Sequence, residues 1–297
     1  MVGTALIQML TEKGYKVIVL SRNPVKKSGH PLISYALWDV KKQTIDIGAI
    51  QAADYIIHLA GAGVVAKKWT AAYKAEILNS RTMSSKLLVD ALKNNPNKVK
   101  AVVSASAIGW YGADNNRNQS FTESDPADDS FLGNTCKLWE QSIELVEHLN
   151  IRLVKLRLGI VLSNKGGALT EFRKPLKLGV AAILGDGKQV VSWIHIHDLC
   201  NIFIEAIENE HLTGTYNAVA PYPVTNKTLT LTLAKILHTN FYLTVNVPVF
   251  ILNLMMGERS IEVLKSTTVS SNKIEKAGFT FSYPTIEKAL KQINGVI

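Results

Sequence analysis

The chain has 297 residues, of which 47% are hydrophobic, and a formal net charge of +9 at pH 7. This composition excludes an intrinsically disordered chain and is sufficient for one large domain, or for a domain with a smaller lobe. The excess of basic residues alone would suit nucleic acid, but lysine pairs such as Lys41-Lys42 and Lys67-Lys68 are short, scattered and without interleaved aromatic residues. We therefore expect solvated basic faces and no nucleic-acid partner.

The cysteines and the start of the chain give further expectations. Cys136 and Cys200 lie far apart without a CxxC pair, which argues against a disulfide framework or a zinc ribbon and makes a reducing cytoplasm the expected location. Residues 1–10 are apolar without a basic leader, and no apolar run is long enough to cross a bilayer, so we expect neither a signal peptide nor a membrane partner. His195 and His197 have no evident third ligand nearby, so we expect structural hydrogen bonds rather than a metal.

The first half of the sequence alternates between helical and strand-like segments. A helix is predicted over residues 4–13, because Ala5, Leu6, Met9 and Leu10 recur at helical spacing, and Gly14 ends it. Short apolar runs predict strands at 16–20, 55–60, 99–104 and 152–157, with helices at about 70–95 and 134–149 between them. This alternation predicts an α/β fold with a doubly wound parallel sheet.

After residue 165 the sequence changes to glycine-rich loops with short elements between them, which suggests a second, smaller lobe. Glycine-rich loops at 166–167 and 185–187 are interpreted as turns, with a phosphate cradle as the alternative. A strand is predicted at 192–197, with Asp198 as the cap of a helix over 199–209, and the tail beyond residue 247 is mostly amphipathic helix. We divide the chain into a dinucleotide-binding domain at 1–165, to which 190–216 returns, and a mainly C-terminal substrate lobe at 166–297.

Residues that directly follow the predicted strands are the candidates for ligand binding, because α/β sheets bind ligands beyond the carboxyl ends of their strands. Ser21 and Arg22 follow the first strand, and an arginine fork there favours a 2′-phosphate, hence NADP over NAD; the alternative is an exposed loop arginine. Gly61 follows the second strand and would let a cofactor approach the backbone. The third strand ends at Ser104 and Ser106, whose hydroxyls suit a carbonyl or alcohol oxygen, or ordinary turn chemistry.

A dinucleotide-binding fold begins with a strand and a glycine-rich turn, whereas this sequence begins at the predicted helix. Gly3 would be the last glycine of a GxxGxxG run. We expect from this that the strand at 16–20 has an unpaired edge and that phosphate binding is weakened.

The order of many short segments resembles a known family. The matching segments are Val2-Gly-Thr-Ala-Leu6, Val19-Leu-Ser-Arg-Asn-Pro24, His58-Leu-Ala-Gly-Ala62, Asn79-Ser-Arg-Thr82, Ser104-Ala-Ser-Ala-Ile-Gly109, Arg157-Leu-Gly-Ile-Val-Leu-Ser163, Ser192-Trp-Ile-His195, Asn217-Ala-Val-Ala-Pro221 and, in the tail, Gly257-Glu258. Over essentially its whole length the chain resembles the atypical extended short-chain dehydrogenase/reductases of the NAD-dependent epimerase family, sugar-nucleotide epimerase-like proteins with a C-terminal domain. The resemblance implies a Rossmann-type domain that holds NADP(H) and a small lobe that closes over a substrate cleft.

The resemblance also implies roles for single residues. Ser21 and Arg22 would hold the adenosine 2′-phosphate, and Leu59 and Ala60 would line the ribose and pyrophosphate path. On the helix that follows, Glu76 and Arg81 would reach the cofactor, with an exposed pair as an equal alternative.

For the reacting end of the cofactor, the resemblance implies that Ser104 and Ser106 lie beside the nicotinamide, with Ser106 polarising the substrate oxygen. Gln189 and Trp193 would contact the substrate.

The sequence departs from this family at its usual acid/base pair. Cys136-Lys-Leu-Trp-Glu140 stands where the Tyr-x-x-x-Lys motif aligns, and a thiol with a carboxylate cannot simply replace a phenol with an ammonium group. Tyr111 or Lys137 would have to compensate, although neither has the standard spacing. Two functions therefore stay open: an NADP(H)-dependent oxidoreductase or epimerase-like enzyme acting on a small polar or nucleotide-linked substrate, and a low-turnover NADPH-binding sensor.

Overall fold

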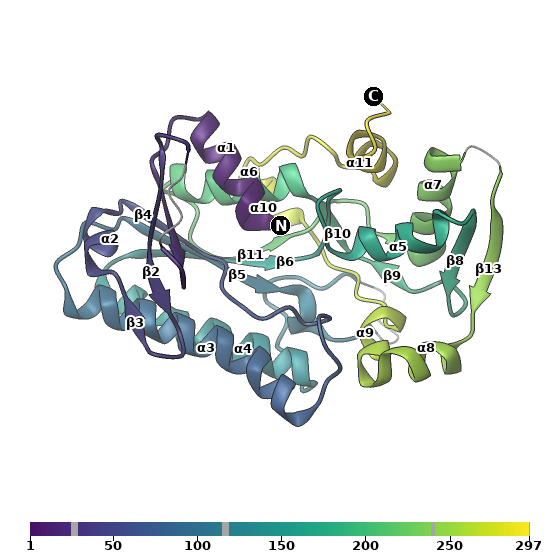
Figure 1. The fold of residues 1–297 in the computed structure, drawn as a ribbon, viewed down its shortest axis with the longest axis horizontal. Helices are drawn as coiled ribbons and strands as arrows, with labels where there is room; N and C mark the ends of the chain where they lie inside the picture. Colours follow the sequence, from purple (N-terminus) through teal and green to yellow (C-terminus); the bar gives the residue numbers. More distant parts are fainter. Residues whose placement is uncertain (25–28, 115–118, 239–240, 297) are drawn as a thin grey trace.

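Two sets of strands form the centre of the molecule (Figure 1). The computed structural model describes residues 1–24, 29–114, 119–238 and 241–296. In the first set, β1 (Val17–Ser21) pairs in parallel with β2 (Ile33–Asp39), and β3 (Thr44–Ile45) runs antiparallel to β2. The second set is wholly parallel. Its order is β11 (Gly214–Ala218), β6 (Arg152–Leu158), β5 (Ala101–Ala107) and β4 (Tyr55–His58).

Helices cover both faces of the four-stranded sheet. One face carries α1 (Val2–Glu12) and α6 (Ile196–Glu208), and the other carries α3 (Ala71–Asn94) and α4 (Phe131–Glu144) (Figure 1). The shorter helices α2 (Ile47–Ala52) and α10 (Asn272–Lys276) contact α3 and β11, respectively. In the described part of the chain, 3₁₀ turns lie at Ile108–Tyr111, Glu147–Leu149 and Gly257–Arg259. This arrangement confirms the predicted α/β fold with helices wound over both faces of a parallel sheet.

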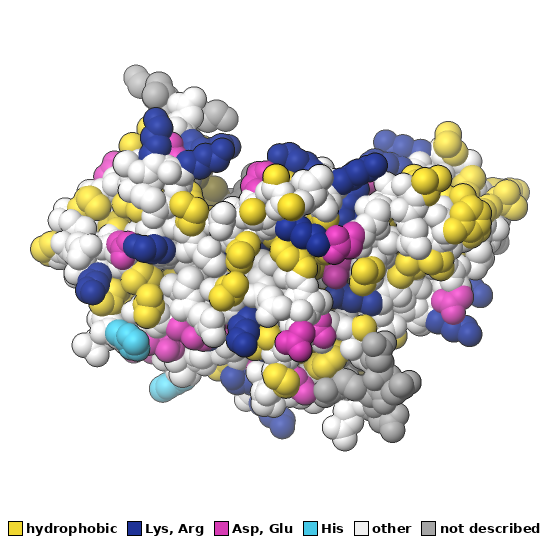
Figure 2. All heavy atoms as spheres, turned by 90° about the horizontal axis from the view of Figure 1, so that it is seen from below, with side chains coloured by type: hydrophobic (Ala, Val, Ile, Leu, Met, Phe, Trp, Pro, Cys, Tyr) yellow, Lys and Arg dark blue, Asp and Glu magenta, His cyan; other side chains and the backbone are white. Residues whose placement is uncertain are grey.

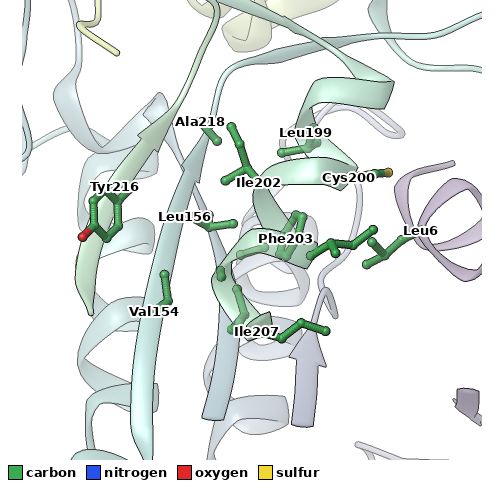
Figure 3. Packing of buried hydrophobic residues seen from close by; sticks show 14 of the residues in the cluster. Leu6, Val154, Leu156, Leu199, Cys200, Ile202, Phe203, Ile207, Tyr216 and Ala218 are labelled. Atoms are coloured by element: carbon green, nitrogen blue, oxygen red, sulfur yellow. The ribbon is translucent and has the colours of Figure 1, made fainter. Parts of the chain in front are cut away.

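The apolar side of α1 is held in the core beneath α6. Leu6 and Leu10 are buried, and Figure 3 shows Leu6 pointing toward α6, which carries Cys200 and Phe203. Each such leucine contributes about 1.5–3 kcal/mol through its removal from water. Gly14 follows the end of α1 with a φ of +87°, a left-handed conformation that a glycine adopts without strain. The predicted role of Gly14 as the helix stop is therefore confirmed.

The remaining elements form a second region with its own core around Trp193. Three strand pairs belong to it. They are β7 (Ile160–Leu162) with β10 (Trp193–His195), β8 (Val180–Leu184) with β13 (Leu243–Val247), and β9 (Val190–Val191) with β12 (Val224–Thr225). Its helices are α5 (Ala168–Leu176), α7 (Asn226–His238), α8 (Val249–Met256), α9 (Ser260–Leu264) and α11 (Ile286–Ile293). Figure 2 shows apolar side chains gathered at the end of the molecule that bears β13 and α8. Of the helices described, none has the length and apolar character needed to span a membrane.

The predicted cap of helix α6 is wrong. The helix α6 begins at Ile196, and its cap is His195, whose Nδ1 accepts from the backbone N–H of His197 at 3.1 Å. Asp198 lies inside the first turn and is fully buried, and its two carboxylate oxygens accept the backbone N–H groups of Ser282 and Tyr283, each at 2.9 Å. A buried carboxylate needs such donors more than a helix end does, so Asp198 holds the C-terminal segment instead.

His58 is a buried histidine between β4, β5 and α3. Only 4% of its surface is exposed, and its ring nitrogens lie 3.3 Å from Ser104 Oγ and 3.0 Å from Ser84 Oγ. Burial lowers the pKa of His58 from 6.5 to about 4, because the charged imidazolium loses its hydration. The folded protein therefore keeps His58 neutral at pH values at which the unfolded chain protonates it.

This difference predicts a loss of stability as the pH falls from about 6.5 to 4, because the unfolded state then binds the extra proton. For His58 alone the loss reaches about 3 kcal/mol at pH 4. Urea unfolding measured across this window should show a shallower decline for His58→Gln than for the wild type. The exposed His148→Gln serves as the control and should follow the wild type. Equal slopes for all three proteins would contradict the assignment.

Candidate functional site

The candidate site lies where the order of the strands reverses. On one side of this point lie β1 and β2, and on the other side lie β4, β5 and β6 in that order. Tyr15 and Tyr55, beside the amino ends of β1 and β4, interact electrostatically, so the two strands begin at the same edge. At the opposite edge, a Cβ on Gly3 would lie 3.7 Å from Leu59 Cδ1, which places the start of α1 beside the carboxyl end of β4. Reversal points of this kind are where α/β sheets bind ligands.

Ser21 and Arg22 lie at the carboxyl end of β1. The Ser21 hydroxyl accepts the backbone N–H of Asn23 at 3.2 Å and shapes the turn that follows the strand. Arg22 is exposed, and its guanidinium forms no ion pair with any residue that the structure describes. Its five donors are therefore available for an anion at this edge.

The loop after β4 is held by Arg81 of α3. Arg81 Nη1 donates to the carbonyl oxygens of Ala62 at 3.1 Å and Ile77 at 2.8 Å, and burial lowers its pKa. A Cβ on Gly61 would lie 3.1 Å from Arg81 Cζ, closer than most side chains tolerate. Gly61 therefore lets the loop lie against the guanidinium, with the half-buried Leu59 and Ala60 just before it.

The structure separates the two residues of α3 that were expected to act together. Arg81 contacts the loop, whereas Glu76 is exposed and pairs with Lys67 at 3.2 Å. An exposed pair of this kind contributes at most about 1 kcal/mol. Arg81 thus lies at the candidate edge, and Glu76 faces solvent beside it.

Ser104 and Ser106 share one face of β5 but have different partners. Ser104 is fully buried, and its Oγ lies 3.3 Å from His58 Nδ1. The Ser106 hydroxyl donates to Glu140 Oε1 at 2.7 Å and is 2% exposed. The Ser106 hydrogen is therefore committed to a carboxylate in this conformation.

Glu140 and Arg157 form a buried ion pair behind Ser106. Arg157 Nε donates to Oε1 at 2.8 Å and Nη2 donates to Oε2 at 3.1 Å, and both side chains are 3% exposed. Burial alone would lower the pKa of Arg157, but the Glu140 carboxylate more than offsets this and the pKa is raised. Lys155 lies on β6 with Arg157, and its Nζ is 3.8 Å from Glu140 Oε2. Both oxygens of the Glu140 carboxylate are thus paired with cationic side chains.

Tyr111 extends this network toward β11. Its hydroxyl accepts from Arg157 Nη1 at 2.9 Å and donates to Asn217 Oδ1 at 2.6 Å, and the Arg157 guanidinium lies 3.7 Å above the Trp110 ring. Burial raises the pKa of Tyr111 to about 12, although Arg157 acts in the opposite direction. Tyr111 is 2% exposed. It therefore holds its proton in the network rather than exchanging it readily.

Cys136 lies one turn before Glu140 on α4 and is buried. Burial, followed by the Glu140 charge, raises the pKa of its thiol to about 12. The thiol stays protonated, and both oxygens of Glu140 are occupied by the guanidinium of Arg157. The two residues at the positions of the usual tyrosine and lysine therefore have no proton that moves easily near neutral pH.

The two predicted substrate contacts lie in the second region. Gln189 Nε2 donates to the carbonyl oxygens of Leu184 at 3.1 Å and Val263 at 3.0 Å, so its amide nitrogen links two loops. Trp193 is fully buried, and its Nε1 donates to Tyr222 O at 3.0 Å. Their roles as substrate contacts stay predictions, and both side chains hold the second region together in this conformation.

Arg157, Asn217 and Glu123 had no predicted role, yet they complete the network. The backbone N–H of Asn217 donates to Glu123 Oε1 at 2.8 Å. The sequence does contain a signal, because Lys155 and Arg157 alternate with apolar residues in a buried strand, and buried charges require acidic partners. The sequence pattern does not say which acid supplies the partner.

Comparison with known proteins identifies the family of the chain. Residues 1–218 match the model of the NAD dependent epimerase/dehydratase family, and residues 247–293 match a domain of unknown function (DUF1731). An epimerase family protein of Staphylococcus haemolyticus is 33% identical over 296 residues, which covers 99% of this chain and 95% of that protein. The epimerase family protein YfhF of Bacillus subtilis is 32% identical over 292 residues, 98% of this chain and 94% of that protein.

A solved structure extends the likeness to three dimensions. The human epimerase family protein SDR39U1 (isoform 2), crystallised with NADPH, has a TM-score of 0.86 and 27% sequence identity, and the match covers 100% of this chain and 97% of that chain. These matches confirm the resemblance and the Rossmann-type fold expected from it. The chain belongs to the NAD-dependent epimerase/dehydratase family.

Proposed function

We propose that the chain binds NADP(H) along the carboxyl edge of its sheet and acts as an oxidoreductase or epimerase-like enzyme on a small polar or nucleotide-linked substrate. The observation that carries the proposal is Arg22, an exposed guanidinium without an ion pair among the described residues, at the end of β1 where the strand order reverses. An arginine fork there matches the oxygen geometry of a 2′-phosphate. The human relative crystallised with NADPH supports this choice of cofactor.

The residues along this edge fit a dinucleotide. Arg22 would hold the 2′-phosphate beside Ser21, and Leu59 and Ala60 would line the path of the ribose and pyrophosphate past Gly61. In this proposal, residues 1–165 form the cofactor domain, to which 190–216 returns through α6, although Trp193 packs in the core of the second region. The rest of 166–297 forms the substrate lobe. When bound, the nicotinamide supplies the chemistry of hydride transfer.

Removal of the Arg22 charge tests the cofactor assignment. Arg22→Ala should weaken NADPH binding about 10- to 100-fold, because a charge-assisted hydrogen bond contributes about 1.5–3 kcal/mol. NADH binding should change little, since NADH has no 2′-phosphate. Titration calorimetry of both dinucleotides gives the readout, with Lys42→Ala in the exposed β2–β3 turn as the control. Equal losses for NADPH and NADH, or no loss for NADPH, would refute the assignment.

The chain's own residues would bind and orient the substrate oxygen at Ser106. For this the Ser106 hydroxyl must leave Glu140 Oε1, which Arg157 Nε continues to satisfy at 2.8 Å. The carboxylate therefore does not become unpaired when the serine turns away. This redundancy makes Ser106 the residue of the network that is most readily released toward a ligand.

Ser106→Ala separates catalysis from cofactor binding. We expect hydride transfer to slow about 10²-fold, the typical effect of losing one donor to a reacting oxygen, while the Kd for NADPH stays unchanged. Single-turnover oxidation of bound NADPH with an active carbonyl substrate measures the first quantity, and fluorescence titration measures the second. Ser142→Ala on α4, whose hydroxyl donates to Trp139 O, is the control. Unchanged single-turnover rates would exclude Ser106 from the reaction.

A second candidate function is an NADPH-binding sensor with little turnover. It is favoured by the Cys136 thiol with its pKa near 12 and by the fully paired Glu140, which leave the usual acid/base positions without a mobile proton. Stopped-flow oxidation of bound NADPH against a panel of carbonyl compounds and sugar nucleotides distinguishes the two functions. Turnover of any panel member on the timescale of seconds would favour the enzyme, and silence throughout would favour the sensor.

A further inference from the structure

A segment without charges forms one end of the second region. Residues 241–256 contain no Asp, Glu, Lys, Arg or His, although 19% of the whole chain is Asp, Glu, Lys or Arg. The segment supplies β13 and α8, which lie at the outer end of the molecule in Figure 1, and Figure 2 shows apolar side chains gathered at this end. A soluble chain normally buries an apolar run of this length.

The exposed apolar side chains of this segment, which we call the β13–α8 face, come from both elements. They are Leu243 and Val245 on β13, and Val249, Phe250, Leu254 and Met255 on α8. Phe250 is 68% exposed, and Leu254, one helical turn later, is 78% exposed. Together the six side chains leave roughly 700 Å² uncovered, more than a single soluble chain usually exposes in one patch. A stable interface takes about 600–1,000 Å² from each partner, so the face is large enough to form one.

The strand β13 also carries an open backbone edge. Within the described residues it pairs with β8 alone. Leu243 N donates to Gly179 O at 2.8 Å, and Val247 O accepts at 2.9 Å from the N–H of the residue that follows β8, so the odd-numbered residues of β13 direct their backbone groups toward β8. Because these groups alternate along a strand, Thr244 and Asn246 direct theirs to the open edge. The edge therefore offers two donors and two acceptors.

The sequence of β13 has none of the residues that usually prevent edge pairing. Soluble proteins protect open edges with lysine, proline or inward-pointing charges. The strand reads Leu-Thr-Val-Asn-Val, in which β-branched residues predominate, and Pro248 comes only after the strand has ended. An unprotected apolar edge of this kind is a template for pairing with another strand.

We propose that the β13–α8 face is the interface of a symmetric homodimer, in which β13 pairs antiparallel with β13 of a second copy and joins two β8–β13 sheets into one. The two-fold axis passes beside Val245, which lies opposite its own counterpart. Thr244 exchanges backbone hydrogen bonds with Asn246 of the partner subunit, and the reverse exchange satisfies the rest of the open edge. The end of β13 that bears α8 then lies beside the start of the other β13, where Leu178 is 83% exposed.

A second copy fits this face better than a membrane or an unrelated protein. A two-fold axis brings a charge near its centre close to its own like-charged counterpart, so a self-pairing interface favours a segment without charges, as at 241–256. The hydrocarbon of a bilayer cannot satisfy the open backbone groups of Thr244 and Asn246. The inference is independent of the cofactor and of the reaction, so its test is made without dinucleotide.

Charge variants at Val245 test the dimer and its register together. The wild type should sediment as a dimer at about 10 µM. Val245→Lys and Val245→Glu should each weaken dimerisation at least about 100-fold, because like charges meet across the axis. An equal mixture of the two variants should form a heterodimer. Val245→Thr, which keeps the β-branched shape without a charge, is the control and should stay dimeric, and near-UV circular dichroism checks that every variant is folded.

An engineered disulfide gives an independent readout of the axis. Residues in a non-hydrogen-bonded antiparallel pair have Cα atoms about 4.5 Å apart, a distance that a disulfide spans. Val245→Cys should therefore oxidise to a covalent dimer on a denaturing gel. Val65→Cys, at an exposed position outside the face, is the control and should remain a single chain. The native Cys136 and Cys200 are buried and do not compete.

Several outcomes would overturn the proposal. A wild type that stays monomeric at about 100 µM lacks the interface. A dimer that Val245→Lys leaves intact has its contact elsewhere, and a mixture of the Lys and Glu variants that stays monomeric rules out the register. Wild-type protein that remains monomeric in solution but binds phosphatidylcholine vesicles, with loss of binding in Val245→Lys, would make the face a membrane-docking surface instead.

Discussion

The buried pair of Glu140 and Arg157 is the interaction on which the candidate active site depends. Two charges leave water at a cost of several kcal/mol each, and that cost is offset only because both carboxylate oxygens and most guanidinium donors are satisfied. The pair joins α4 to β6, reaches β5 through Ser106, and reaches β11 through Tyr111 and Asn217. Elements distant in the sequence thereby meet at one edge of the sheet, and loss of Glu140 would leave the buried guanidinium of Arg157 without the carboxylate that it contacts through two nitrogens.

Much of this architecture was predictable from local patterns, and the reason is physical. Apolar runs of strand length must be buried on both faces, so the strands at 55–58 and 152–158 and the helix at 71–94 follow from periodicity alone. The cap of α6 was not predictable, because Asp198 finds its donors at Ser282 and Tyr283, far along the chain. The two short strands β8 and β13 pair only through tertiary contacts and carry no distinctive local pattern.

The candidate site, like the fold, was only partly predictable from the sequence. Ser21 and Gly61 follow strands as predicted, and such positions share one edge because parallel strands share the direction of their carboxyl ends. Ser104 and Ser106, however, lie within β5 rather than after it. The interactions of those positions could not be read from the sequence: Arg81 turns toward Ala62, while Glu76 turns to solvent, although both lie on α3. Helical spacing fixes the face on which a residue lies but not the partner that the folded chain provides.

The central chemical question is the origin of the proton that must accompany hydride transfer to a carbonyl. Within the described site, the Cys136 thiol and the Tyr111 phenol both have pKa values near 12, and Glu140 is paired with Arg157. An enzyme built on this site would therefore take its proton from the substrate or from solvent and use Ser106 only to orient the reacting oxygen. Such a catalyst would be slow with poorly activated carbonyls and faster with substrates that carry their own acid, so the intrinsic acidity of the substrate, rather than its size, would decide which compounds react.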